Sequence, residues 1–171
     1  MIHENHKWDR VLEFLFNNSN KKFTVREISR KTKISTSTVQ RYIKTLKKRG
    51  FIDKDNSANI TPYFKLEKAF FIIEKAFETG LMDYLDSNFN PSLIVLFGSA
   101  RKGEYDSESD IDIFIESVKT PTINLLSFEK KIGHKIELFI RKDIKDLPEN
   151  LFNNILNGIK LGGYLKLKWG T

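Results

Sequence analysis

The chain has 171 residues, of which 40% are apolar, and its formal net charge is +7. This length suffices for one ordinary domain or two small ones, and the apolar content supports folded cores and argues against disorder. The absence of cysteine excludes disulfides and thiolate metal sites, and three scattered histidines are too few for a zinc site.

Two features of the sequence bear on where in the cell the protein is found. Residues 1–10 are polar and charged, so we expect no secretory signal peptide. The longest apolar runs have the length of strands, so we expect no membrane-spanning segment and no membrane partner. A cytoplasmic protein is the expectation that follows.

The charge is spread unevenly along the chain. Residues 1–66 hold 15 Lys and Arg against 6 Asp and Glu, whereas residues 67–171 hold 14 against 16. This asymmetry predicts a basic module joined to a nearly neutral one. A basic small domain suits a polyanion such as duplex DNA, and a solvated Lys-rich surface is the alternative.

Three helices are predicted within the first 50 residues. Apolar residues recur at helical spacing over residues 6–18. A second helix is expected from Val25 to about Lys31, because Thr24 and Glu27 form a capping box at its start. The third helix ends at Gly50, and its apolar face consists of Val39, Tyr42, Ile43 and Leu46.

A β-hairpin is predicted after these helices. Residues 51–53 and 60–66 are its expected strands, residues 54–59 its turn, and Pro62 indicates an edge strand. The order of three helices and a hairpin resembles the winged helix-turn-helix family over about residues 6–66. We therefore define residues 1–66 as a winged-helix DNA-binding domain.

That resemblance places the third helix in the major groove of duplex DNA. Its polar, basic face and the wing turn supply the candidate DNA-binding residues, which are Ser35, Thr36, Ser37, Thr38, Gln40, Arg41, Lys44, Lys47 and Lys54. A winged helix used for contact with another protein is the alternative.

Strands and helices alternate in the remainder of the chain. A linker helix is expected over residues 67–89, and its Phe-rich face is either the seam of a homodimer or buried within one chain. Strands are then predicted at residues 93–97, 110–115 and 135–140, a helix at 123–131, and a final helix through Leu147, Leu151, Ile155 and Ile159. The pattern predicts an α+β protein whose second domain, residues 90–171, contains a small mixed sheet with flanking helices.

The segment between the first two of these strands carries the chemistry. The first strand ends in Gly98-Ser99, where a glycine lets a phosphate approach the backbone, and Arg101 and Lys102 add positive charge. Asp110 and Asp112 follow on one face of the second strand, with their Cα atoms roughly 7 Å apart. Two neighbouring carboxylates repel each other, and a bound hard divalent cation such as Mg²⁺ or Mn²⁺ removes that repulsion.

A third carboxylate lies on the next predicted strand. Glu137 stands between the apolar residues Ile136 and Leu138. If this strand pairs beside residues 110–115, Glu137 becomes a natural third metal ligand.

Gly98-Ser99, Asp110-Ile111-Asp112 and Glu137 together resemble the DNA polymerase beta nucleotidyltransferase superfamily, over about residues 90–165. The resemblance implies that Gly98, Ser99, Arg101 and Lys102 hold the phosphates of a nucleoside triphosphate. It also implies that Asp110, Asp112 and Glu137 are catalytic metal ligands and that Glu137 helps to activate the acceptor hydroxyl. The family more often has Asp where this chain has Glu137, whose side chain is longer.

Two functions follow. The first is an enzyme that transfers a nucleoside monophosphate from a nucleoside triphosphate to a hydroxyl and that also binds DNA. The acceptor is left open between a partner protein, as in antitoxin-like members, a nucleic-acid end and a small molecule. The second is a DNA-binding regulator whose nucleotidyltransferase-like domain only senses nucleotide or a partner.

Overall fold

The computed structural model describes residues 6–166, which belong to two compact units. The first unit contains the chain up to Leu66 together with Tyr105–Ser107, and the second contains Glu67–Glu104 and the chain from Glu108 onward. Helices and a mixed sheet make the protein α+β, as predicted. No helix within residues 6–166 combines the length and the apolar character that crossing a membrane requires.

Three helices build the first unit, α1 (His6–Asn17), α2 (Val25–Thr32) and α3 (Thr36–Lys48). Their predicted apolar faces are buried, and the core includes Val11, Leu15, Phe16, Ile28, Val39 and Leu46. The predicted capping residue Thr24 accepts a hydrogen bond from the Glu27 amide at 3.1 Å, which fixes the start of α2. After α3, Gly50 adopts a φ of +74°, the left-handed conformation expected after a helix C-terminus.

The predicted hairpin is reduced to a single bridge between Ile52 and Ala58. Its turn is held by the Asp53 carboxylate, which accepts hydrogen bonds of 2.9 Å from the amides of Asp55 and Ser57. The prediction of a strand over residues 60–66 is wrong, because helix α4 begins at Pro62 and runs to Glu78.

The start of α4 explains why that prediction failed. Pro62 occupies the first helical position, where its missing N–H costs nothing, and it does not mark the edge of a sheet. The Thr61 hydroxyl accepts a hydrogen bond from the Phe64 amide at 3.1 Å, as a helix N-cap does. Phe64 is then fully buried and packs edge-to-face against Phe16 and Phe51. Tertiary packing of one aromatic ring thus outweighs the apparent strand pattern.

Tyr105 is a core residue of the first unit, although it stands far from the other residues of that unit in the sequence. Its side chain is only 1% exposed, and burial, together with the negative charge of Glu13, raises the pKa of its hydroxyl. Two residues later, the Ser107 amide donates to the Asn17 carbonyl at the end of α1 at 3.2 Å. The first unit therefore closes around a segment that no local sequence signal assigned to it.

The predicted linker helix of residues 67–89 is two helices. Helix α4 ends at Glu78, and α5 (Leu81–Phe89) begins after Gly80, whose φ is +78°. The left-handed backbone at this glycine breaks the helix, although the apolar periodicity continues across the break. From Glu67 onward, the chain belongs to the second unit except for Tyr105–Ser107.

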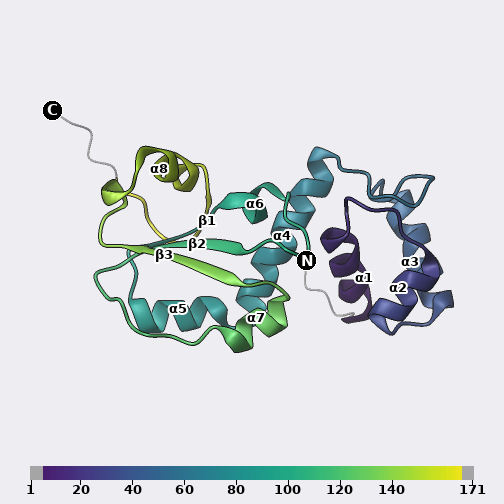
Figure 1. The fold of residues 1–171 in the computed structure, drawn as a ribbon, viewed down its shortest axis with the longest axis horizontal. Coiled ribbons are helices and arrows are strands. Elements are labelled where there is room, and N and C mark those ends of the chain that lie inside the picture. Colours follow the sequence, from purple (N-terminus) through teal and green to yellow (C-terminus); the bar gives the residue numbers. More distant parts are fainter. Residues whose placement is uncertain (1–5, 167–171) are drawn as a thin grey trace. The chain divides into compact units, whose positions relative to one another are not determined.

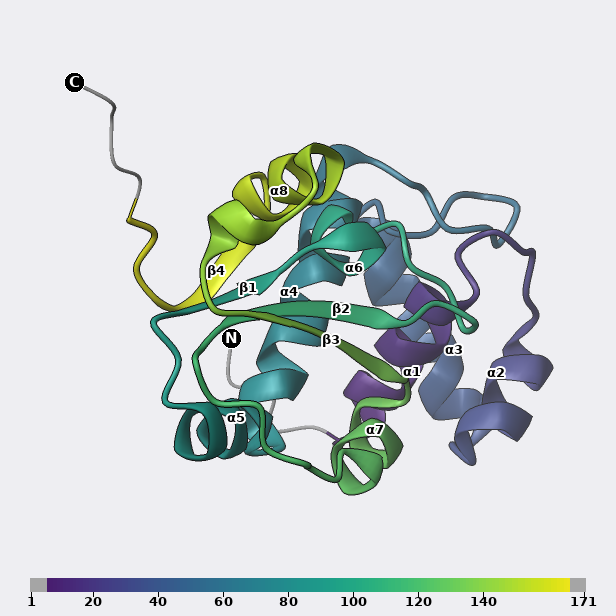
Figure 2. The ribbon, with the colours of Figure 1, turned by 60° about the vertical axis from the view of Figure 1, so that its left-hand side comes forward.

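The second unit contains a four-stranded sheet in the order β3-β2-β1-β4. The strands are β1 (Leu93–Leu96), β2 (Ile111–Glu116), β3 (Ile136–Arg141) and β4 (Ile159–Gly163). β1 is antiparallel to β2 and β4, whereas β2 and β3 are parallel. Figures 1 and 2 show α8 (Glu149–Leu156) on one face of the sheet and α5 and α7 (Leu126–Ile132) on the other.

The face of the sheet beneath α8 carries a compact apolar cluster. Val95 and Phe114 are opposite each other in the β1–β2 register, and both belong to it. The other buried members come from β1 and the residue after it, from α8, and from the short 3₁₀ helix η1 (Ile144–Asp146) and the residue after it. They are Leu93, Phe97, Ile144, Leu147 and Ile155. Because Phe114 belongs to this cluster, the β2 side chains two residues away from it and their partners on β3 lie on the same face.

The prediction that the final helix continues through Ile159 is wrong. Helix α8 ends at Leu156, and Ile159 begins the edge strand β4, which the sequence analysis did not predict. The reason lies at Gly158, where a Cβ atom would overlap the Val95 side chain and the backbone carbonyl of Leu96. Only a glycine lets the chain pass this close to β1 and turn into a strand.

Candidate functional site

The turn at the end of β1 brings the chain backbone against a carboxylate. Gly98 has a φ of +67° and begins the short helix α6 (Gly98–Lys102). A Cβ atom on Gly98 would overlap the Asp112 carboxylate. A glycine is therefore required at position 98 for two reasons, its backbone conformation and the space that the Asp112 side chain occupies.

Helix α6 carries the other residues of the predicted phosphate-binding loop. Ser99 and Arg101 are half-buried, and Lys102 is exposed. The Ser99 carbonyl accepts a hydrogen bond from the Glu104 amide at 2.9 Å, and Gly103 ends the helix in the left-handed conformation. The segment between β1 and β2 thus begins with a short helix that starts at Gly98.

The structure brings the three predicted carboxylates to the same part of the sheet. Asp110 stands immediately before β2, Asp112 is its second residue, and Glu137 is the second residue of β3. In the parallel β2–β3 register, Asp112 is the direct partner of Glu137, and Phe114 is the partner of Phe139. Directly paired residues share a face of the sheet, so Asp112 and Glu137 lie on the face that carries the apolar cluster.

The negative charges of Glu137 and Asp110 act on Asp112. The pKa of Asp112 is raised above its ordinary value, first by burial and then by the negative charges of Glu137 and Asp110. Partial burial and two neighbouring carboxylates both disfavour the ionised form of an Asp side chain at neutral pH. A positive charge placed beside Asp112 would relieve this repulsion.

His134 positions the start of β2. Its Nδ1 atom lies 2.9 Å from the Ser109 carbonyl, and its side chain is buried. The Ile111 amide donates to the Lys135 carbonyl at 2.9 Å, so the entrances of β2 and β3 are joined on both sides of Asp110. His134 lies between α7 and β3, and a lone histidine gives no signal of this contact in the sequence.

The raised pKa of Asp112 makes stability depend on pH. Because the folded state holds this proton more tightly than the unfolded state, the side chain stabilises the fold below its unfolded pKa. That contribution is lost as the pH rises through the folded pKa. Asp112→Asn removes the charge, so we expect its melting temperature to exceed that of the wild type at neutral pH. The difference should vanish at acidic pH.

Calorimetry in metal-free buffer at the two pH values measures this difference. Asp86→Asn, which neutralises an exposed carboxylate on α5, is the matched control and should show no such pH-dependent gain. A lower melting temperature for Asp112→Asn at neutral pH would contradict the prediction.

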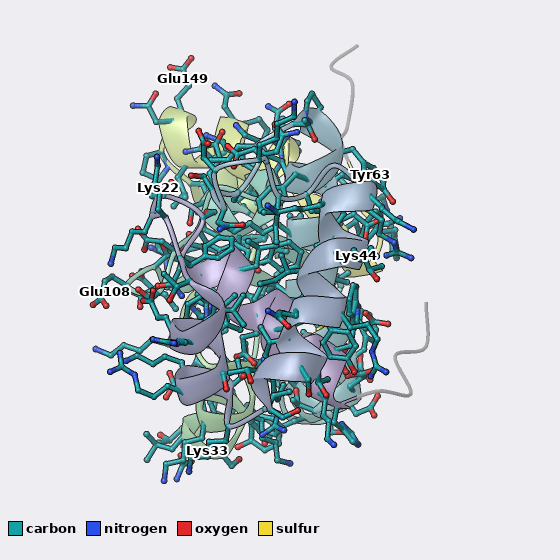
Figure 3. The ribbon with its side chains drawn as sticks, turned by 90° about the vertical axis from the view of Figure 1, so that its right-hand side faces the viewer. Lys22, Lys33, Lys44, Tyr63, Glu108 and Glu149 are labelled. Atoms are coloured by element: carbon teal, nitrogen blue, oxygen red, sulfur yellow. The ribbon has the colours of Figure 1, made fainter. Side chains whose placement is uncertain are left out.

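The predicted DNA-binding residues lie on and around α3. Gln40, Arg41, Lys44 and Lys47 are all exposed, opposite the buried face formed by Val39, Tyr42, Ile43 and Leu46. Figure 3 shows Lys44 projecting outward on one side of the unit and Lys22 on the other. The structure therefore presents the basic residues of α3 on one solvent-facing surface.

Two details of this surface were not predicted. The Lys47 ammonium donates to the Lys54 carbonyl at 3.3 Å, so Lys47 ties α3 to the wing turn. At the start of α3, the Ser35 hydroxyl donates to the Thr38 hydroxyl at 3.0 Å and lies 3.3 Å from Ser37. Thr36 is exposed beside them. The Thr38 hydroxyl accepts its bond from Ser35 and keeps its own hydrogen for a further contact.

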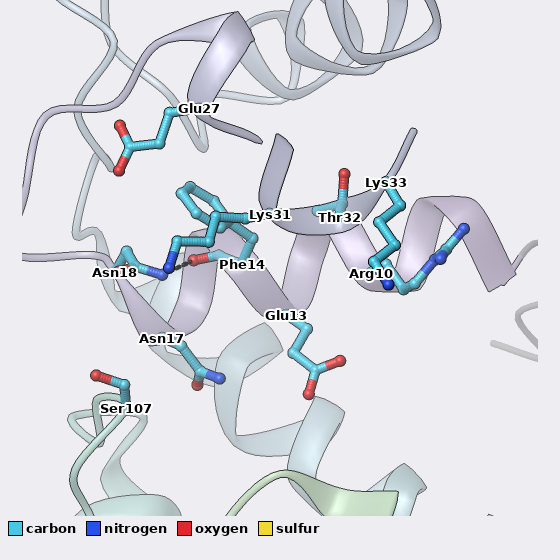
Figure 4. Close-up of a pocket in the computed structure, with 10 residues that line it drawn as sticks. All are labelled: Arg10, Glu13, Phe14, Asn17, Asn18, Glu27, Lys31, Thr32, Lys33 and Ser107. Carbon is cyan, nitrogen blue, oxygen red and sulfur yellow. Dashed lines mark hydrogen bonds between the residues drawn. The ribbon is translucent and has the colours of Figure 1, made fainter. Parts of the chain in front are cut away.

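A separate open pocket of about 590 Å³ lies in the first unit, beside α1 and α2 (Figure 4). It shares no residue with the predicted DNA-binding set. Basic residues Arg10, Lys31 and Lys33 line it together with the acidic residues Glu13 and Glu27, so it carries no dominant charge. All but one of its lining residues come from α1, α2 and the residues next to them, and Ser107 is the exception.

Two known families each match one part of the chain. Residues 7–58 match the family described as HTH domain, and residues 79–159 match the family described as Nucleotidyltransferase domain. No curated protein matches the chain. No solved structure matches it either.

Proposed function

We propose that this chain, which joins an N-terminal helix-turn-helix domain to a nucleotidyltransferase domain, transfers a nucleoside monophosphate from a nucleoside triphosphate to a hydroxyl acceptor and binds duplex DNA. In the transfer, the acceptor oxygen bonds to the α-phosphorus, the bond to the β-phosphate oxygen breaks, and pyrophosphate leaves. The acceptor proton passes to a base or to solvent. A hydroxyl of a partner protein is the acceptor we test first.

One observation carries this proposal. Asp112 is paired in register with Glu137, follows Asp110, and packs against a glycine that starts the phosphate-loop helix. A chain that needed only a stable sheet would have no reason to keep three carboxylates together at a cost in electrostatic energy. Such an arrangement is typical of sites that handle polyphosphates with divalent cations.

The nucleotidyltransferase family generally uses divalent metal ions, so the fit of the residues to such an ion matters. The donor chemistry fits Mg²⁺ or Mn²⁺, because carboxylate oxygens are the ligands these ions prefer. Within residues 6–166, however, no three Asp, Glu or His side chains already form a closed metal cluster. We propose that Asp110 and Asp112 are the primary ligands and that Glu137 completes the set when nucleotide is bound.

The positions of the other site residues in the fold indicate their roles. When bound, the metal ions neutralise charge on the phosphates and help to align the in-line attack. Gly98 and Ser99 let the phosphates approach the backbone, and Arg101 and Lys102 supply positive charge from the next turn. Glu137 is more exposed than Asp112, which suits a group that accepts the proton of an incoming hydroxyl.

The test of this proposal uses the full-length chain with each of four α-labelled nucleoside triphosphates. Label should move to a macromolecular acceptor in the presence of Mg²⁺ or Mn²⁺ and not in the presence of chelator, with pyrophosphate released in equal amount. Binding of metal and triphosphate should also raise the melting temperature by mass action.

The second candidate function is a DNA-binding regulator that senses nucleotide without chemistry. The lack of a closed three-ligand cluster among the described residues favours it. Saturable triphosphate binding without pyrophosphate release or label transfer would support this function over catalysis. Absence of both binding and transfer would refute both candidates.

DNA binding has its own prediction. Lys44→Ala should weaken binding to all duplex sequences alike and lower the slope of log affinity against log salt by about 1, because one phosphate contact is lost. Lys22→Ala removes the same charge from another side of the unit and is the matched control. Gel-shift titrations of the full chain at several salt concentrations measure both slopes. Equal effects of the two substitutions would refute the placement of DNA on α3.

A further inference from the structure

The sheet of the second unit has a second polar end, opposite the end that carries the candidate site. β1 begins there, and Leu93 at its start is paired with Glu116, the last residue of β2, and with Gly163, the last residue of β4. β3 runs parallel to β2 and also ends there, at Arg141. The segments that enter β1 and leave the other three strands therefore meet at one edge of the sheet.

An open pocket of about 210 Å³ lies at this edge. Its basic side chains are Lys142 directly after β3, Lys145 in η1 and Lys166 beyond β4. All three are exposed, and within residues 6–166 none of their ammonium groups has a hydrogen bond or an ion pair. Three ammonium groups with unused donors therefore line one small space, which we call the lysine pocket.

The two acidic side chains of the lysine pocket are engaged by other groups. One carboxylate oxygen of Glu116 accepts a hydrogen bond from the Ile144 amide at 2.9 Å, and the other accepts one from the Ser92 hydroxyl at 2.5 Å. The Asp143 carboxylate accepts a hydrogen bond from the Lys145 amide at 2.9 Å. These bonds hold the segments around the pocket together, and they leave the ammonium groups as its unpaired charges.

An aromatic ring accompanies the lysines. Tyr164 lines the lysine pocket and is 63% exposed. Its amide donates to the Ser92 carbonyl at 3.0 Å, which fixes the backbone that carries the ring. Proteins hold single-stranded nucleic acids with this combination, because cations contact the phosphates and an exposed ring stacks on a base.

We propose that the lysine pocket binds a single-stranded nucleic acid. The ammonium groups of Lys142, Lys145 and Lys166 hold phosphodiester oxygens, and the Tyr164 ring stacks on a neighbouring base. The pocket is smaller than the roughly 300–1,000 Å³ of sites that enclose a whole drug-sized ligand, so it suits one section of a longer strand. A duplex keeps its bases stacked on one another and offers none to the ring. This binding does not rest on nucleotidyl transfer, and it uses a different unit from the duplex-binding helix α3.

Fluorescence anisotropy of a short labelled oligo(dT) with the full chain tests the lysines. Lys145→Ala should lower the slope of log affinity against log salt by about 0.7, the value for one phosphate contact on a single strand, and should leave duplex binding unchanged. Lys130→Ala removes the same charge from the exposed surface of α7 and is the matched control. Equal slopes for the two variants, an equal loss of duplex binding, or no binding of oligo(dT) at low salt would overturn the proposal.

Substitutions of Tyr164 test the stacking. Tyr164→Ala should weaken oligo(dT) binding by roughly 5- to 150-fold, the loss expected for one base stacked on an aromatic ring. Tyr164→Phe keeps the ring and should bind like the wild type, and both variants should keep the wild-type melting temperature because the side chain is exposed. Wild-type affinity in Tyr164→Ala would overturn the stacking. Displacement of oligo(dT) by equimolar pyrophosphate would assign the pocket to a free phosphate anion and overturn the proposal.

Discussion

Asp112→Asn is expected to reduce the rate of nucleotidyl transfer by a factor on the order of 10²–10³, the loss typical when one preorganised electrostatic group of a site is removed. Asn keeps the size of the side chain but removes the charge that lies between Asp110 and Glu137. The same change should raise the melting temperature at neutral pH, because it relieves the repulsion among the carboxylates. Loss of activity together with a gain in stability distinguishes a functional carboxylate from a structural one.

Rates of label transfer at saturating triphosphate measure this loss. Asp86→Asn neutralises an exposed carboxylate of α5 and should transfer at the wild-type rate. Glu137→Gln should lower the transfer rate more than it lowers triphosphate affinity, since we place Glu137 at the acceptor. Transfer by Asp112→Asn at the rate of Asp86→Asn would remove Asp112 from the site.

Gly98→Ala should impair both stability and activity. The left-handed backbone at position 98 costs about 1–2 kcal/mol for a residue with a Cβ atom. The new methyl group also overlaps the Asp112 carboxylate and must displace it. We therefore expect transfer to fall nearly as far as in Asp112→Asn, although every charged group of the site is still present.

Gly80→Ala separates these two effects. Gly80 has a similar φ of +78°, but a Cβ atom there meets nothing within 4 Å. Gly80→Ala should lose only the stability that the left-handed backbone costs, Gly98→Ala should lose at least as much in chemical denaturation, and only Gly98→Ala should lose transfer. If both variants transferred equally well, the close approach of Gly98 to Asp112 would have no functional importance.

Local signals in the sequence determined much of the first unit and the motif of the second. The apolar periodicities of α1 and α3, the Thr24 cap and Gly50 act over a few residues, so they predicted the helices with small errors at the ends. The same holds for Gly98-Ser99 and for Asp110 and Asp112, whose shared face follows from the alternation of side chains along a strand. Such features depend on chain geometry that a few neighbouring residues dictate.

The tertiary structure alone decided the features that depend on residues distant in the sequence. Glu137 could be named from its sequence, but only the parallel register of β2 and β3 pairs it with Asp112. Pro62 looked like the edge of a strand until the burial of Phe64 made it the start of α4. Likewise β4 exists because Gly158 passes close to β1, and Tyr105 joins the core of the first unit across a long gap in sequence. In each case the free energy that stabilises the local structure comes from packing or pairing with a distant segment. Such contacts leave no periodic signal in the local sequence.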